Sequence, residues 1–158
     1  MSSNHPTSIL FVCMGNICRS PAAECLTRIA LERRGLQDAF ILDSAGTGGW
    51  HQGNKPDRRM RKAAADVQKR IDGEARKVNK SDLETFDWIF CMDEDNYDHL
   101  LSLGANPEKT HLFLEFIDHP TTREVPDPYY GGDEGFAHVI ALIEEGAQLL
   151  IDRLHKTL

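Results

Sequence analysis

The segment from Cys13 to Ser20, Cys-Met-Gly-Asn-Ile-Cys-Arg-Ser, constrains the fold of this chain more than any other feature. The run before it, Ser8–Val12, is short, apolar and rich in β-branched and aromatic residues, which is typical of a buried strand. Pro21 follows the segment and opens a stretch rich in alanine, and proline favours the first turn of a helix. The sequence therefore predicts a tight loop between a buried strand and a helix, with Cys13 where the strand ends.

A loop in that position is suited to bind an anion, because the first N–H groups of a helix lack internal partners and carry the positive end of its dipole. Gly15 and Asn16 tolerate the backbone angles of a curled loop, so that successive N–H groups converge. The same groups stabilise a thiolate on Cys13, and Arg19 offers paired donors to two phosphate oxygens. We expect Ser20 to cap the helix and to donate its hydroxyl to the sulfur.

The alternative for Cys13 is a small core residue, which is the usual role of a cysteine in an apolar strand. That role does not require the glycine, asparagine and arginine that follow it, nor a change from strand to helix directly afterwards. The spacing therefore favours a nucleophile in a phosphate-binding loop.

Short apolar runs alternate with helical patterns along the rest of the chain. Further strands are predicted at 40–42, 88–92 and 110–113, helices at 21–34, 57–70 and 93–103, and a capped turn of helix at 81–84. Apolar residues at helical spacing between Phe136 and Leu154 predict a long amphipathic helix. This order predicts an α/β fold, a parallel sheet with helices on both faces, whose ligands bind beyond the carboxyl ends of the strands.

Composition excludes several classes of protein. The chain has 158 residues, of which 27% are charged and 41% hydrophobic, and this predicts one globular domain spanning 1–158. Its net charge of −7 argues against nucleic acid as a partner, since binding to a phosphate backbone needs a basic surface. No leader sequence and no apolar run of membrane-spanning length is present, so we expect a cytoplasmic protein that does not associate with a membrane.

Two smaller patterns concern cysteines and basic residues. The four cysteines are expected to be free thiols, their spacing gives no zinc-like pair, and we expect no metal or cofactor. Six basic residues cluster on the helix predicted at 57–70, where such a run usually forms a solvated face and, as the alternative, docks an acidic partner. These residues are Arg58, Arg59, Arg61, Lys62, Lys69 and Arg70.

A second segment with chemical potential runs from Val125 to Gly132, and in it two prolines flank Asp127. Phosphoryl transfer from an aryl ester requires a proton for the departing oxygen, and an acid held by a stiff loop opposite the nucleophile supplies it. Tyr129 and Tyr130 are placed to flank a flat aromatic substrate. The pairing with the cysteine loop favours this interpretation over an ordinary turn.

The glycine-rich segment Gly46–Gly49 precedes Trp50 and His51. Its spacing does not match the dinucleotide-binding fingerprint and it follows the wrong strand, so a flexible loop is predicted. Trp50 either lines a substrate wall or packs in the core, and His51 is expected to be solvated.

Together these segments resemble the low-molecular-weight protein tyrosine phosphatases, and the resemblance covers nearly the whole chain. It rests on Cys13–Ser20, Asp43–Gly46, Trp50, Cys91–Asp93 and Asp127–Tyr130, which occur in the order and approximate spacing of that family. The resemblance implies a flavodoxin-like domain of four parallel strands. It also implies hydrolysis of phosphotyrosine in protein substrates, and of small aryl phosphates, without a metal ion.

By matching position, the resemblance implies roles for individual residues. Cys13 is the nucleophile, Arg19 binds the phosphate and Asp127 is the general acid. The phosphate-binding residues are Met14, Gly15, Asn16, Ile17, Cys18 and Ser20, and the substrate-binding residues are Trp50, Tyr129 and Tyr130. The expected reaction forms a phosphocysteine, which a water activated by Asp127 then hydrolyses.

Two details of the loop stay open at this point. Cys18 is either a redox partner that forms a reversible disulfide with Cys13 or only a small loop residue. Many members of the family resemble His-x-Ala-Arg where this chain has Gly73-Glu74-Ala75-Arg76, and that histidine can steady the asparagine of the loop. Some other group or a water therefore has to support Asn16.

Two other functions fit part of the pattern. An arsenate reductase on the same scaffold has a similar Cys-x4-Cys-Arg loop, but it needs further redox cysteines, and only Cys25 and Cys91 remain. A module that binds phosphotyrosine without hydrolysing it does not need both Cys13 and Asp127. The sequence does not indicate the oligomeric state.

Overall fold

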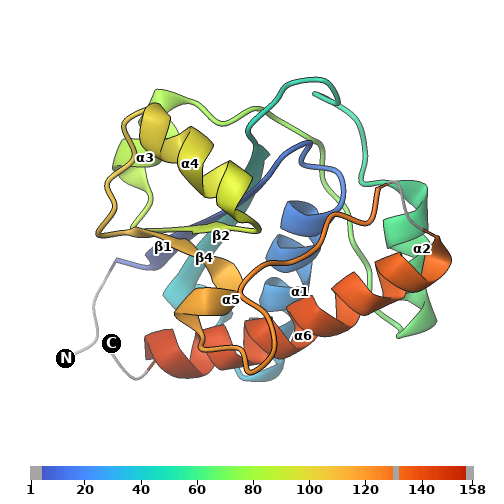
Figure 1. Cartoon of the computed structure of the whole chain (residues 1–158). Coiled ribbons are helices and arrows are strands. Elements are labelled where there is room, and N and C mark those ends of the chain that lie inside the picture. The colour runs from blue at the N-terminus through green and yellow to red at the C-terminus, as the bar shows by residue number, and fades with distance from the viewer. Residues whose placement is uncertain (1–4, 130–131, 156–158) are drawn as a thin grey trace.

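A computed structural model describes residues 5–129 and 132–155. In the described part the chain forms a four-stranded parallel sheet in the order β2-β1-β3-β4 (Figure 1). The strands are β1 (Thr7–Cys13), β2 (Phe40–Gly46), β3 (Trp88–Cys91) and β4 (Thr110–Leu112). The predicted α/β fold with a parallel sheet is confirmed.

Helices cover both faces of this sheet. They are α1 (Arg19–Arg33), α2 (Arg58–Asp66), α3 (Lys80–Thr85), α4 (Glu94–Ser102), α5 (Phe113–Phe116) and α6 (Asp133–His155), with a short 3-10 helix at Gln37–Ala39. Figure 1 shows α3 and α4 on one side of the sheet and α1, α5 and α6 on the other. No helix in the described ranges has both the length and the apolar character needed to cross a membrane.

The core consists of two apolar clusters, one on each side of β1. Side chains alternate along a strand, so Ile9 and Phe11 pack against α1 and α6, while Leu10 and Val12 pack on the side of α3 and α4. All four side chains are buried. A strand buried on both faces has a continuous apolar sequence, which is why this run predicts a central strand.

The central position of β1 determines where the site lies. Its neighbours are β2 on one side and β3 on the other, and the connections leave in opposite directions, so a crevice opens at its carboxyl end. Cys13 is the last residue of β1, opposite Gly46 of β2. The backbone N–H of Val125 donates to the carbonyl of Met92 at 2.8 Å, which ties the Asp127 loop to the segment after β3.

Helix ends differ from the predictions in three places. Ser20 was expected to cap α1, but the N-cap is Cys18, and the Ser20 hydroxyl is buried within the first turn where it contacts the Cys13 sulfur. The cap of α3 is Asn79, paired with Asp82, in place of the predicted box at 81–84. Asn79 is the better acceptor because its extended backbone precedes the helix, whereas Ser81 is already helical.

The third difference concerns α2, which ends at Asp66 and not near Arg70. Gln68 adopts a left-handed conformation with φ of 59°, and the N–H groups of Gln68 and Lys69 bond back to the carbonyls of Ala65 and Ala64. These two bonds close the helix in a Schellman motif. The end of α1 follows the prediction, with Gly35 at φ of 70°.

Candidate active site

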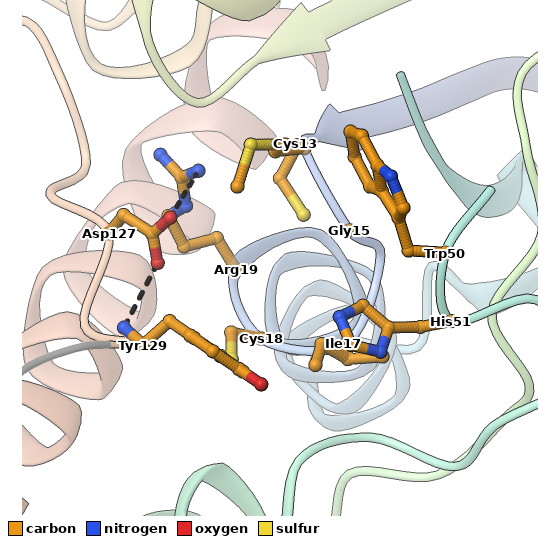
Figure 2. Close-up of a pocket in the computed structure, with 10 residues that line it drawn as sticks. Cys13, Gly15, Ile17, Cys18, Arg19, Trp50, His51, Asp127 and Tyr129 are labelled. Carbon is orange, nitrogen blue, oxygen red and sulfur yellow. Dashed lines mark hydrogen bonds and ion pairs between the residues drawn. The ribbon is translucent and has the colours of Figure 1, made fainter. Parts of the chain in front are cut away.

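A cavity of about 380 Å³ opens beside the carboxyl end of β1 (Figure 2). It is lined by Cys13, Met14, Gly15, Ile17, Cys18, Arg19, Trp50, His51, Asp127 and Tyr129. The structure thus brings the cysteine loop together with Asp127, more than a hundred residues later in the chain. Tyr130, also expected in the site, lies outside the described residues.

The Cys13 sulfur is surrounded by hydrogen-bond donors. The backbone N–H of Asn16 points to Sγ at 3.3 Å, and the Ser20 hydroxyl oxygen lies 3.0 Å from it. Asn16 belongs to the loop before α1 and Ser20 to its first turn, where the amino end of the helix adds the positive end of its dipole. This arrangement favours a negative charge on the Cys13 sulfur.

Asn16 keeps the loop curled. Its φ of 58° is a left-handed conformation that non-glycine residues adopt only with support from their surroundings. The side-chain amide donates to the hydroxyls of Ser20 at 2.8 Å and Ser44 at 3.1 Å, and its carbonyl accepts the N–H of Arg76 at 2.9 Å. Ser44 and Arg76 therefore support Asn16 in this chain, which has Gly73 at the position where many members of the resembled family have a histidine.

Backbone N–H groups in the loop are available to an anion. Within residues 5–129 and 132–155, the N–H groups of Gly15, Ile17 and Cys18 have no hydrogen-bond acceptor. They belong to the turn that curls around the Cys13 sulfur, ahead of α1. Converging free N–H groups next to a helix terminus are suited to bind phosphate oxygens.

Arg19 is the fixed positive charge of the site. Its guanidinium donates to Asp93 Oδ2 at 2.6 Å and to the carbonyl of Val125 at 3.0 Å, and it lies 3.6 Å from Asp127 Oδ2. Burial alone would lower the pKa of Arg19, but the negative charges of Cys13, Asp93 and Asp127 raise it above its ordinary value. The guanidinium therefore stays charged although it is buried.

Asp93 holds Arg19 in place, although its place in the sequence does not predict this contact. Asp93 caps α4 by accepting the N–H of Asn96 with Oδ1. Its other carboxylate oxygen binds Arg19. An acidic residue directly after a buried strand was the available signal, because that strand end faces the crevice.

Asp127 projects into the cavity from its proline-flanked loop, beside Arg19 (Figure 2). The N–H of Tyr129 donates to Asp127 Oδ1 at 3.0 Å, while Oδ2 faces Arg19. One oxygen is therefore held by the loop itself, and the other lies beside the Arg19 guanidinium.

Aromatic side chains form the walls of the cavity. Trp50 is 72% exposed and lines the cavity, so it does not pack in the core. His51 was expected to be solvated; it is half-buried and also lines the cavity. Its ring packs against Gly15, where a Cβ atom would lie 3.0 Å from His51 Cδ2, and its centroid is 6.1 Å from that of Tyr129.

The remaining cysteines are neutral thiols at ordinary pH. Burial raises the pKa of Cys18, and the negative charges of Asp57, Cys13 and Asp127 raise it further. Burial also raises the pKa of Cys25, to about 11, and that of Cys91. All four cysteines are free, as predicted. Among the described residues, no cluster of three or more His, Cys, Asp or Glu is arranged to hold a metal ion.

The chain is similar to one family over nearly its whole length. Residues 8–158 match the family described as low molecular weight phosphotyrosine protein phosphatase. A putative low molecular weight protein-tyrosine-phosphatase of Synechocystis is 42% identical over 95% of this chain and 98% of the relative. A low molecular weight protein-tyrosine-phosphatase of Bacillus subtilis is 39% identical over 94% of this chain and 96% of the relative. A crystal structure of a protein tyrosine phosphatase from Entamoeba histolytica superimposes with a TM-score of 0.90 at 42% identity, covering 96% of this chain and 98% of that one.

Proposed function

The chain belongs to the low molecular weight phosphotyrosine protein phosphatase family, and we propose that it hydrolyses phosphotyrosine in proteins through a phosphocysteine intermediate, without a metal ion. One observation carries the proposal. The Cys13 sulfur, contacted by the Asn16 N–H at 3.3 Å and the Ser20 hydroxyl at 3.0 Å, shares a cavity with Arg19 and Asp127. Nucleophile, positive charge and acid are thus within reach of one phosphate group.

In the first step, the Cys13 thiolate attacks phosphorus and the bond from phosphorus to the tyrosyl oxygen breaks. Asp127, protonated, donates its proton to the departing oxygen. Arg19 and the free N–H groups of the loop stabilise the charge on the three non-bridging oxygens. The products are a phosphocysteine and a tyrosine side chain.

In the second step, a water attacks phosphorus and the bond to sulfur breaks. Asp127, now a carboxylate, accepts a proton from this water. The Ser20 hydroxyl, 3.0 Å from the sulfur, stabilises the thiolate as it leaves. Inorganic phosphate departs, and Cys13 and Asp127 return to their starting forms.

The walls of the cavity match an aromatic phosphate ester. The Tyr129 ring and the exposed Trp50 can contact the two faces of a phenyl ring, while Ile17 adds apolar surface near the loop. We propose phosphotyrosine-containing proteins as substrates and small aryl phosphates as substitutes. We also propose the cytoplasm as the compartment, since free thiols persist under reducing conditions.

Leaving-group dependence tests the assignment of Asp127. In an Asp127→Ala variant, hydrolysis of phenyl phosphate should fall by about 10²–10⁴-fold, because its leaving group needs a proton. Hydrolysis of 4-nitrophenyl phosphate should fall much less. Equal losses for the two esters would remove Asp127 from the role of general acid.

Rapid acid quench of the wild type during turnover should yield a phosphorylated cysteine at position 13, detected by mass spectrometry. The Cys13→Ser variant should show neither turnover nor phosphoenzyme, and a chelator should leave the wild-type rate unchanged. A turnover-competent Cys13→Ser variant would contradict the mechanism.

The same assays separate the alternatives considered from the sequence. A thiol relay for arsenate reduction needs cysteines that can reach the cavity, yet Cys91 is fully buried in β3 and Cys25 contacts the carbonyl of Asp72. Thiol-dependent loss of arsenate without aryl phosphatase activity would support the reductase. Binding of phosphotyrosine without release of phosphate would support the binding module.

A further inference from the structure

Positive charge is concentrated on one side of an acidic protein. Residues 55–70 contain seven Lys or Arg and two Asp, whereas the whole chain has a net charge of −7. This segment includes α2, which lies at the periphery of the molecule (Figure 1). Such an asymmetry gives that side a positive potential of its own, although the protein as a whole repels anions.

Part of this charge serves the protein itself. Arg59 pairs with Asp57, and its guanidinium stacks over the rings of Tyr129 at 5.3 Å and Phe136 at 4.6 Å. Lys62 pairs with Asp66 one turn later on α2. Arg59 therefore has a structural role, and Lys62 belongs to the solvated face of α2.

Other basic residues converge on a groove beside α2. The groove has a volume of about 570 Å³, and four of the residues that line it are basic: Lys55, Arg61, Lys69 and Arg70. Two carboxylates, Asp72 and Glu74, also line it. In the described part of the chain, no ion pair joins Lys55 or Arg61 to a carboxylate, and the pairs of Lys69 and Arg70 are long, at 3.5 Å each. The groove therefore keeps positive charge that an anion can contact.

The groove begins close to the active-site cavity. Arg61 Nε donates to the carbonyl of Pro56 at 3.0 Å, which places this guanidinium at the end of the groove where Lys55 lies. Lys55 follows His51, a wall of the cavity, by four residues, and four residues span at most about 14 Å. The N–H of Asp57 also donates to the carbonyl of Ile17 in the phosphate-binding loop at 2.7 Å.

We propose that this basic groove is a docking site for acidic residues of the phosphoprotein substrate, so that the enzyme prefers phosphotyrosines with Asp or Glu about four positions away. The inference rests on the proposed function. With phosphotyrosine in the cavity, an extended substrate of about four residues reaches Lys55 and Arg61, and the next residues reach Lys69 and Arg70. The groove selects among substrates and takes no part in the chemistry.

The size of the effect follows from the exposure of these pairs. Each exposed ion pair contributes modestly, so two or three of them should raise kcat/KM by about five- to tenfold. Because the pairs are exposed to solvent, salt should screen them and reduce the preference.

The experiment compares pairs of phosphotyrosine peptides. The two peptides of a pair differ only in a cluster of residues three to six positions from phosphotyrosine, which is Glu in one and Gln in the other. One set of pairs has the cluster on the amino-terminal side of phosphotyrosine, and a second set has it on the carboxyl-terminal side. For the wild type at low salt, at least one set should show the five- to tenfold preference for Glu, carried mainly by KM. The double variant Lys55→Gln/Arg61→Gln should lose most of this preference. Hydrolysis of 4-nitrophenyl phosphate by the variant should equal that of the wild type.

A matched control removes the same charge elsewhere. The Arg33→Gln/Lys109→Gln variant changes residues at the end of α1 and just before β4. Both lie at the amino-terminal end of the strands, opposite the end where the cavity opens, and the variant should keep the preference. An equal loss in both double variants would show a general effect of net charge and overturn the proposal. An unchanged Glu preference in Lys55→Gln/Arg61→Gln would also overturn the proposal. This holds even if the variant bound an oligonucleotide more weakly than the wild type, because the groove would then bind a different anion.

Failure of the docking proposal is distinguishable from failure of the proposed function. If the wild type does not hydrolyse 4-nitrophenyl phosphate, the catalytic proposal fails. If it hydrolyses this ester but shows no preference for either Glu set, only the docking proposal fails.

Discussion

At the scale of single residues, the loop separates two cysteines that are only five positions apart. Cys13 faces the Asn16 N–H and the Ser20 hydroxyl, which stabilise a negative charge. Cys18 is buried, and burial is the largest cause of its raised pKa. The negative charges of Asp57, Cys13 and Asp127 raise this pKa further. In the proposed mechanism the Cys13 sulfur is the nucleophile, whereas burial keeps Cys18 a protonated thiol in the same cavity.

Cys18 lines the same cavity as Cys13, which places its thiol where it can trap an oxidised Cys13. Peroxide should convert Cys13 to a sulfenic acid, and the Cys18 thiol should condense with it to a disulfide and water. We predict that the wild type recovers most of its activity with dithiothreitol, whereas Cys18→Ser recovers little because Cys13 oxidises further. Residual 4-nitrophenyl phosphatase activity measures the recovery.

Cys25→Ser is the control for this experiment, because the Cys25 sulfur contacts Asp72 and does not line the cavity. It should recover as the wild type does. Equal recovery of Cys18→Ser and Cys25→Ser would show that Cys18 is only a small loop residue.

At the scale of elements, the ends of α1 and α2 differ in backbone strain. Both α1 and α2 close with a Schellman motif, but the left-handed position is Gly35 in the first and Gln68 in the second. A side chain in that conformation costs roughly 1–2 kcal/mol, and glycine avoids this cost. The sequence places a glycine after α1 but not after α2, so the end of α2 is harder to predict.

These two positions form a matched pair of substitutions. Gln68→Gly should stabilise the protein by about 0.5–1 kcal/mol, raising Tm by roughly 2–4 °C, because it relieves the left-handed strain. Gly35→Ala should destabilise it by about 1 kcal/mol although a Cβ at Gly35 meets no atom within 4 Å. Urea titrations measure both changes, and shifts of the same sign would contradict the explanation.

Asp57 links the start of α2 to acid stability. Its carboxylate accepts the N–H of Arg59 as the N-cap and pairs with the Arg59 guanidinium. Burial alone would raise the pKa of Asp57, but the bonds from Arg59 outweigh it and hold the pKa below its ordinary value. The resulting stability is present above the unfolded-state pKa of about 4 and is lost as pH falls through the folded-state value.

We therefore predict that Asp57→Ala lowers the free energy of unfolding at pH 7 by about 1–2 kcal/mol. Asp57→Asn keeps an acceptor for the cap and should lose less. The deficit of either variant relative to the wild type should shrink as pH falls below about 4, since the wild-type carboxylate is then protonated. Denaturant unfolding at a series of pH values measures it, and a deficit that grows toward acid would contradict this account.

At the scale of the whole molecule, the long helix α6 closes one face of the sheet. Gly146 lies where α6 crosses α5, and a Cβ at this position would be 2.8 Å from the Phe113 ring. That ring is fully buried and packs edge-on to Phe11 of β1 at 5.8 Å between centroids, so it has no room to move. The absence of a side chain at Gly146 thus lets α6 approach the sheet.

Gly146→Ala should consequently destabilise the protein by about 1–3 kcal/mol, although alanine favours a helix by about 1 kcal/mol over glycine. The control is Gly135→Ala in the first turn of α6, where a Cβ would make only an ordinary contact with Pro128 at 3.8 Å. That substitution should be neutral or slightly stabilising. Thermal unfolding distinguishes the two, and a stabilised Gly146→Ala variant would show that α6 has room to shift.

Much of the fold and part of the site could be predicted because the signals are local. The buried strand Ser8–Val12, the loop that follows it and the apolar face of the last helix each lie in one continuous segment. The resemblance of Cys13–Ser20 and Asp127–Tyr130 to the phosphatase family is confirmed by a match over residues 8–158. By contrast, Asp93 binds Arg19 across 74 residues, and Ser44 and Arg76 hold Asn16 across 28 and 60 residues.

The sequence by itself determined the eight-residue loop, since a strand end, a glycine, an asparagine and a helix start within one segment suffice to converge N–H groups on a sulfur. Only the tertiary structure decided which distant groups support this loop and line its cavity. The strand order places β2 and β3 on either side of β1, and this brings Ser44 and Asp93 to the end of β1. The physical reason is that hydrogen bonds along a chain segment follow from its own backbone, whereas contacts between segments depend on how all the strands and helices pack.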